Sequence, residues 1–222
     1  MTYRWNFATV FENLDVLWVG ALGTLRMFAI CAVVGLSLGL VAGLMRHARS
    51  KWAYGPATAF VEFFRNTPVL VQILWFYYAL PILLPFEISP LTAAALGISL
   101  NSAAFSAEIV RGGIESIERG QAEAARALGM TAAQAMRRIV LPQALRRMLP
   151  ALTNRGIEIF KMTTLASAVA YVELLQQGKL LASLNFNPIE TYTVIAVVFF
   201  LCLFPLVQAT YALERRLNRV DA

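Results

Sequence analysis

The sequence predicts an all-α, polytopic membrane protein with five transmembrane helices, which form a single domain over residues 1–222. The first observation is composition: 59% of the residues are hydrophobic and 14% are charged, a balance foreign to ordinary soluble domains. The second is length, because apolar runs of about 20 residues match the hydrocarbon thickness of a bilayer. The third is positive charge, which is concentrated in alternate connecting segments.

The apolar runs locate the five helices. The third and fourth are the least hydrophobic, and a polar stretch at about 114–148 separates them. Because this is the longest polar stretch in the chain, no second globular domain is expected. The helices are expected at about 20–45, 53–80, 91–110, 149–172 and 191–213.

Basic residues predict the orientation. The segments around residues 81–90 and 172–190 carry only Lys179 as a positive charge. The positive-inside rule therefore places the basic clusters in the cytoplasm, the N-terminus outside and the C-terminus inside. The net charge of +6 indicates orientation and contact with lipid headgroups, and it argues against nucleic acid as a partner. The clusters are Arg46, Arg49 and Lys51; Arg111, Arg119, Arg126, Arg137, Arg138, Arg146 and Arg147; and Arg215, Arg216 and Arg219.

The N-terminal part of the chain has two further patterns. Residues 5–18 place apolar positions at helical spacing, with acidic residues between them, which predicts a segment lying along the outer surface of the membrane. No short apolar core ends in a cleavage site, so a cleaved signal peptide is not expected. In the first predicted helix, Gly35, Gly39 and Gly43 form a smooth stripe that permits close helix approach. We favour packing within the subunit over a dimer seam for this stripe.

Several kinds of site are not supported by the sequence. Cys31 and Cys202 both lie in apolar spans, where a small buried hydrophobe is expected and a disulfide is not. His47 lies among basic residues, so no metal site is expected. The chain lacks the G-x-x-x-x-G-K-[ST] phosphate loop and is not expected to hydrolyse ATP. It also lacks HExxH, CxxC and nucleophile-elbow patterns, so neither catalytic residues nor a cofactor are expected in it.

One charged stretch carries the strongest functional signal. It runs from Glu123 to Pro142 and reads EAARALGMTAAQAMRRIVLP. Its spacing resembles, position for position, the EAA-three-Gly-nine-Ile-x-Leu-Pro loop of the permease subunits of bacterial ABC importers. The resemblance is to importers of polar amino acids of the glutamate/aspartate, glutamine, histidine or arginine type, and it covers nearly the whole chain. The matching residues are Glu123, Ala124, Ala125, Gly129, Ile139, Leu141 and Pro142.

Residue preferences predict two short helices in this stretch. Glu123–Leu128 is rich in strong helix formers, and its alanines offer a flat surface that another protein can approach. Gly129 supplies the conformational freedom for a turn, and Thr131 is expected to cap the second helix. Pro142 is expected to bend or end that helix before the fourth predicted span.

The resemblance implies the partners of the chain. It implies a pore made with a second copy of the permease or a close paralogue, two ABC ATPase subunits that bind ATP and Mg²⁺, and an extracytoplasmic solute-binding protein. It also implies residence in the bacterial inner membrane and transport of a polar amino acid. Two alternatives remain open: a non-transporting scaffold or sensor that docks an ATPase through the same loop, and a secondary transporter. The second would normally show inverted internal repeats, which the sequence lacks.

Three acid–base pairs at three-residue spacing occur near or within the predicted spans. Two of them lie in the runs FVEFFRNTPVLVQ and AEIVRGGIESIERGQAEAA, which resemble segments of the same family. Each pair is open to two interpretations: it neutralises itself so that charge can be buried, or it lines the path of a zwitterionic substrate. The pairs are Glu62 and Arg65, Glu108 and Arg111, and Glu158 and Lys161.

Arg155 is the candidate to bind a substrate carboxylate, because it has no acid three residues before it and a guanidinium suits bidentate recognition. Together, Arg155 and Lys161 exceed the single charge of Glu158. This surplus favours glutamate, aspartate or glutamine over arginine and lysine, unless Glu62 or Glu108 from another span balances it. The hydroxyl groups that resemble the family's serine/threonine-rich continuation belong to Thr163, Thr164 and Ser167.

Overall fold

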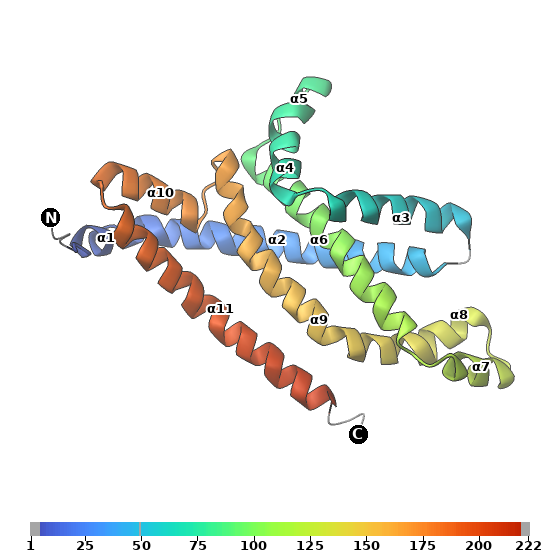
Figure 1. Ribbon diagram of the computed structural model, residues 1–222. Coiled ribbons are helices and arrows are strands. Elements are labelled where there is room, and N and C mark those ends of the chain that lie inside the picture. The colour runs from blue at the N-terminus through green and yellow to red at the C-terminus, as the bar shows by residue number, and fades with distance from the viewer. Residues whose placement is uncertain (1–4, 49, 219–222) are drawn as a thin grey trace.

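The computed structural model describes residues 5–48 and 50–218, which form helices joined by short connections (Figure 1). Arg49 and Arg219, which belong to the predicted basic clusters, lie outside the described residues. The helices are α1 Ala8–Glu12, α2 Leu14–His47, α3 Lys51–Asn66, α4 Val69–Leu74, α5 Leu80–Leu83, α6 Pro90–Glu115, α7 Arg119–Ala127, α8 Ala132–Ala135, α9 Leu141–Met162, α10 Leu174–Asn185 and α11 Pro188–Asn218. The π-helical segments η1 Trp75–Ala79 and η2 Met136–Val140 and the 3₁₀ segment η3 Thr163–Val169 complete the set.

Three helices among the described residues are long and apolar enough to cross a membrane: α2, α6 and α11. A bent pair, Lys51–Asn66 with Val69–Leu83, passes the same test when counted as one span, which makes four. The first, third and fifth predicted helices lie inside α2, α6 and α11, and each of these helices is longer than predicted.

The second predicted helix is not one straight rod. The helix axis bends by 103° between its two halves, because Pro68 has no N–H to donate and Thr67 adopts an extended conformation. The carbonyl groups freed by this break are bonded by amide side chains. Gln72 donates to the carbonyls of Phe64 and Thr67, and Asn101 of α6 donates to that of Phe64 as well.

The fourth predicted helix also differs from expectation. Pro142 does not end the preceding helix, since α8, η2 and α9 continue one another without interruption from Ala132 to Met162. The π turn directly before Pro142 is the kind of local adjustment that accommodates a proline inside a helix. Beyond Met162 the chain tightens into the 3₁₀ segment η3, which ends at Ala170 in a left-handed conformation.

The glycine stripe of α2 packs against α6. A Cβ atom added at Gly35 lies 2.8 Å from Cβ of Ser102, and one added at Gly43 lies 2.6 Å from Cβ of Val110. The predicted packing of the stripe within the subunit is therefore confirmed.

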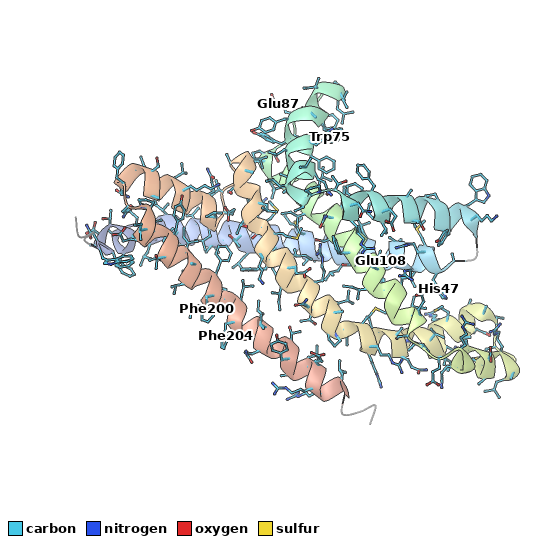
Figure 2. The ribbon with its side chains drawn as sticks, in the orientation of Figure 1. His47, Trp75, Glu87, Glu108, Phe200 and Phe204 are labelled. Atoms are coloured by element: carbon cyan, nitrogen blue, oxygen red, sulfur yellow. The ribbon has the colours of Figure 1, made fainter. Side chains whose placement is uncertain are left out.

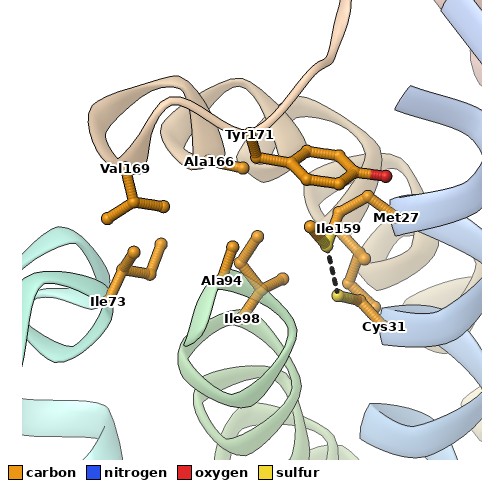
Figure 3. Packing of buried hydrophobic residues seen from close by; sticks show 9 residues of the cluster. All are labelled: Met27, Cys31, Ile73, Ala94, Ile98, Ile159, Ala166, Val169 and Tyr171. Carbon is orange, nitrogen blue, oxygen red and sulfur yellow. Dashed lines mark hydrogen bonds between the residues drawn. The ribbon is translucent and has the colours of Figure 1, made fainter. Parts of the chain in front are cut away.

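A cluster of buried apolar side chains joins α2, α4, α6, α9 and η3 (Figure 3). Its members are Met27, Cys31, Ile73, Ala94, Ile98, Ile159, Ala166, Val169 and Tyr171.

The predicted surface segment at residues 5–18 corresponds to α1 and the first turns of α2. Trp5 and Trp18 are both well exposed, as expected for residues of a membrane interface. The backbone N–H of Asn6 donates to the buried carboxylate of Glu190, 2.8 Å away, so this segment is tied to the start of α11.

Candidate functional site

The stretch with the EAA spacing folds as two helices joined by a tight turn. Gly129 has a φ of 80°, a left-handed conformation that glycine adopts without steric cost. The N–H groups of Met130 and Gly129 donate to the carbonyls of Ala125 and Arg126, which together form a Schellman motif. The hydroxyl of Thr131 accepts the N–H of Gln134, whose side chain accepts the N–H of Thr131 in return, so the predicted cap is confirmed as a capping box.

The exposed face of α7 differs from the predicted alanine surface. Glu123 and Ala124 are exposed, whereas Ala125 is buried against the rest of the loop. At the end of the helix, Leu128 is 81% exposed, an apolar side chain that the sequence reading did not single out. Its signal was its position as the last residue before the turn glycine. The remaining motif residues, Ile139, Leu141 and Pro142, lie in η2 and the start of α9, partly covered or exposed.

A cluster of charges joins the C-terminal end of α2 to α3 and α6, and its central residue, Glu108, is labelled in Figure 2. Glu108 of α6 forms ion pairs with Arg46, with Arg65 at 3.6 Å and with Arg111 at 2.8 Å. The predicted pair of Glu108 and Arg111 is confirmed. The predicted pair of Glu62 and Arg65 is wrong, because Arg65 turns to Glu108 while Glu62 bonds Asn66 and lies 3.9 Å from Arg46. Arg46 was missed because its partner lies on another helix.

Arg155 lies in a buried polar site between α9 and α6. Its guanidinium donates to Glu158 at 2.7 Å and to the Asn101 and Ser102 side chains, both at 3.2 Å. The predicted pair of Glu158 and Lys161 is therefore wrong, since Glu158 pairs with Arg155 and Lys161 is exposed. One guanidinium nitrogen, Nε, is buried without a hydrogen-bond partner in the described chain.

An aromatic ring connects this site to the charge cluster. The guanidinium carbon of Arg155 lies 4.6 Å from the Phe105 ring centroid, and that of Arg65 lies 5.4 Å from it. Both distances permit cation–π attraction. The fold thus brings Arg65, Arg155 and, through Arg65, Glu108 into one region, although they come from three separate helices. The guanidinium groups of this region are of the kind that pairs with carboxylates, and both already have a carboxylate partner within the chain.

The hydroxyl groups after α9 are mostly engaged within the chain. Thr163 and Thr164 donate to the carbonyls of Phe160 and Lys161, one turn earlier. Ser167 accepts a hydrogen bond of 2.8 Å from Lys179 of α10. The hydroxyls of Thr163 and Thr164 therefore retain only their oxygen lone pairs for a ligand, whereas the hydroxyl of Ser167 can still donate.

Residues 35–219 match the sequence profile of the binding-protein-dependent transport system inner membrane component family. The chain belongs to this family. It is 36% identical to the glutamine transport system permease protein GlnP of Escherichia coli (strain K12), over 97% of this chain and 99% of that one. It is 30% identical to the arginine transport system permease protein ArtQ of Bacillus subtilis (strain 168), over 97% and 99%.

The permease fold is shared with solved structures. A chain from the crystal structure of an amino acid ABC transporter with histidines superimposes with a TM-score of 0.90 at 32% identity, covering 96% of this chain and all of that one. The protein is thus a multi-pass permease subunit of an amino acid ABC importer in the inner membrane. It is not an enzyme, because ATP hydrolysis in such importers occurs in a separate ATPase. The family of this permease implies a second permease and a binding protein as further partners.

Proposed function

We propose that the permease crosses the membrane five times, with its N-terminus outside and its C-terminus in the cytoplasm. The crossings are α2, the bent pair from α3 to α5, α6, α9 with η3, and α11. The polarity of α9 supports its place among them, since its buried Arg155 faces α6 rather than lipid. The basic residues at the end of α2, in the α7–α8 region and at the end of α11 support the orientation.

The loop made by α7 and α8 couples the permease to an ABC ATPase in this proposal. The exposed side chains of Glu123, Ala124 and Leu128 form the docking face, and the ATPase binds ATP and Mg²⁺. The observation that carries the proposal is the unbroken helix from Ala132 to Met162. A displacement of the loop by the ATPase travels along this continuous helical segment, through the π turn η2, to Arg155.

The transported solute in this proposal is a polar amino acid, with glutamine, glutamate or aspartate favoured over arginine and lysine. Two guanidinium groups near Phe105 suit a carboxylate, and the similarity to the glutamine permease GlnP supports an uncharged polar side chain. Similarity to the arginine permease ArtQ keeps arginine as the alternative. A second copy or a close paralogue completes the pore, and an extracytoplasmic binding protein delivers the solute.

The coupling role is tested with Glu123→Lys and Gly129→Asp. The first inverts the charge of the docking face, and the second places a side chain where φ is 80°. Both variants are expected to insert normally and to lose most uptake into vesicles. ATP hydrolysis stimulated by the binding protein is expected to be no longer coupled to uptake. Gly112→Ala is the matched control, because a Cβ there meets open space. Unchanged uptake in both loop variants contradicts the coupling assignment.

A further inference from the structure

An apolar groove separates α2 from α11. In Figure 1 the two helices diverge from the end where α1 and α10 lie, and α11 packs on α9 and α10. The groove has a volume of about 640 Å³ and is floored by Phe160 and Phe199. Each wall is a row of side chains four residues apart, which places them on one helix face. The rows are Leu17, Ala21 and Leu25 on α2 and Val194, Val198 and Cys202 on α11.

We propose that this groove binds one acyl chain of a phospholipid from the outer leaflet, whose headgroup carries an amine. The proposal goes beyond transport and coupling, and it uses only the proposed orientation, in which the first turns of α2 lie outside. Because α2 and α11 both have the length and hydropathy of membrane-crossing helices, the groove between them opens into the bilayer rather than into water.

The length of the groove fits a single leaflet. From Leu14 to Leu25 the lining residues cover about 16 Å along α2, at the helical rise of about 1.5 Å per residue. One leaflet with its headgroup layer is about 20 Å thick. The groove therefore begins at the outer surface and ends before the middle of the bilayer, which is the depth range of an outer-leaflet lipid.

The volume of the groove, about 640 Å³, is ample for an extended hydrocarbon chain. Water is excluded, because the lining offers almost no polar partners. A helix from a second permease copy is the competing occupant, and the quenching experiment described below distinguishes the two.

The outer mouth of the groove selects the headgroup. Trp18 lines this end, and tryptophan is enriched at the level of lipid headgroups. Asp15 is the one charged residue among the described residues that line the groove, and it is exposed. Glu12, just before α2, is also acidic and exposed. A headgroup with a cationic amine complements these carboxylates, whereas a headgroup that carries only the phosphate charge is repelled.

The test uses fluorescence of Trp18 in the complete importer, reconstituted in liposomes, with Trp5, Trp52 and Trp75 replaced by phenylalanine. Bromine atoms on the acyl chains of either phosphatidylethanolamine or phosphatidylglycerol quench a tryptophan that they contact. We expect stronger quenching by brominated phosphatidylethanolamine, and a reduction of this preference by up to about fivefold in Asp15→Asn, the upper range for an exposed ion pair.

Two further variants locate the bound chain. Val198→Phe fills the groove and is expected to lower the quenching, whereas Leu201→Phe, at an exposed position of α11 outside the groove, leaves it unchanged. Equal quenching by the two lipids, or no effect of Val198→Phe, overturns the proposal. Absence of quenching by both lipids also overturns it and indicates that a second permease copy covers the groove. Uptake by the same liposomes is measured separately, so a failure of the lipid site leaves the transport assignment untouched.

Discussion

Buried or half-buried charged residues on α6 and α9 are matched by neighbouring charges. Glu108 receives three arginines from α2, α3 and its own helix, and Glu158 lies beside the buried Arg155. Removing one partner of a buried pair leaves an uncompensated charge, which costs several kcal/mol. The pair of Arg155 and Glu158 is unequal, however, since the arginine is 5% exposed and the carboxylate reaches the surface.

Arg155→Ala is expected to reduce amino acid uptake about tenfold or more, since hydrogen bonds to charged groups contribute about 1.5–3 kcal/mol. Uptake of labelled glutamine is measured in vesicles, together with assembly of the complex and its basal ATP hydrolysis. Arg146→Ala, an exposed change on the same helix, is the control. Loss of assembly instead indicates a structural charge, and preferential uptake of lysine or arginine contradicts the charge argument.

Glu173 is expected to make the stability of the fold depend on pH. It caps α10 by accepting the N–H groups of Leu175 and Gln176, it is fully buried, and it lies outside the helices that can cross the membrane. Burial raises its pKa from 4.5 to about 7. Between pH 4.5 and about 7 the carboxyl of Glu173 stays protonated in the folded protein, whereas it is ionised in the unfolded chain. The protonated carboxyl therefore contributes its full share of the folding stability below pH 4.5, and this share is lost as the pH rises to about 7.

Melting temperatures of the wild type and of Glu173→Gln, measured between pH 4 and 8, test this dependence. The difference between the two curves is expected to change across that window and to be constant above it. A difference that is flat at all pH values means that the folded carboxyl has an ordinary pKa.

At the scale of elements, turns and caps follow from local chemistry, whereas broken helices depend on distant residues. Gly129 and Thr131 were predictable, since a left-handed turn and a capping box each need only a few adjacent residues. The break at Pro68 was only partly predictable. Proline frees a carbonyl in any helix, but the sharp bend persists here because Gln72 and Asn101 bond the freed groups, and Asn101 lies on another helix.

The seam between α2 and α6 makes a sharp prediction at this scale. Gly43→Ala is expected to destabilise the permease by about 1–3 kcal/mol, the usual range for overpacking, because the added Cβ meets Val110 at 2.6 Å and the carbonyl oxygen of Ala107 at 2.8 Å. Gly55→Ala, where a Cβ meets open space, is the control. Thermal unfolding in detergent measures both. Equal melting temperatures of the two variants mean that α2 and α6 move apart easily to make room for the added Cβ.

At the scale of the whole molecule, the orientation in the membrane is open to direct test. A cysteine replacing Ser89, between α5 and α6, is expected to react with an impermeant thiol reagent in intact cells. One replacing Ala133, in α8, is expected to react only after permeabilisation, because the basic loop lies inside. Cys31 is buried, and Cys202 is replaced by serine to remove background labelling. The reverse pattern overturns both the orientation and the coupling role.

The sequence alone predicted the helical class, three long helices and the turn between α7 and α8, because these depend on hydropathy and on neighbouring residues. It did not predict which charges meet. Pairing by three-residue spacing succeeded for Glu108 and Arg111, and it failed for Glu62 and for Lys161, since partners on other helices compete for the same carboxylate or arginine. The convergence of Arg65 and Arg155 on Phe105 depends on the packing of three helices and has no local signature.

The close seam of α2 and α6 has a mechanical consequence. Their backbones approach so tightly that neither helix can slide or roll without displacing main-chain atoms of the other, so the pair moves as a rigid frame. Compliance is left to the places where the regular hydrogen-bond ladder is interrupted, which among the described residues include the bend at Pro68, the π-helical segments η1 and η2 and the 3₁₀ segment η3. A change of shape that leaves this frame intact must therefore take place at such interruptions of the helices.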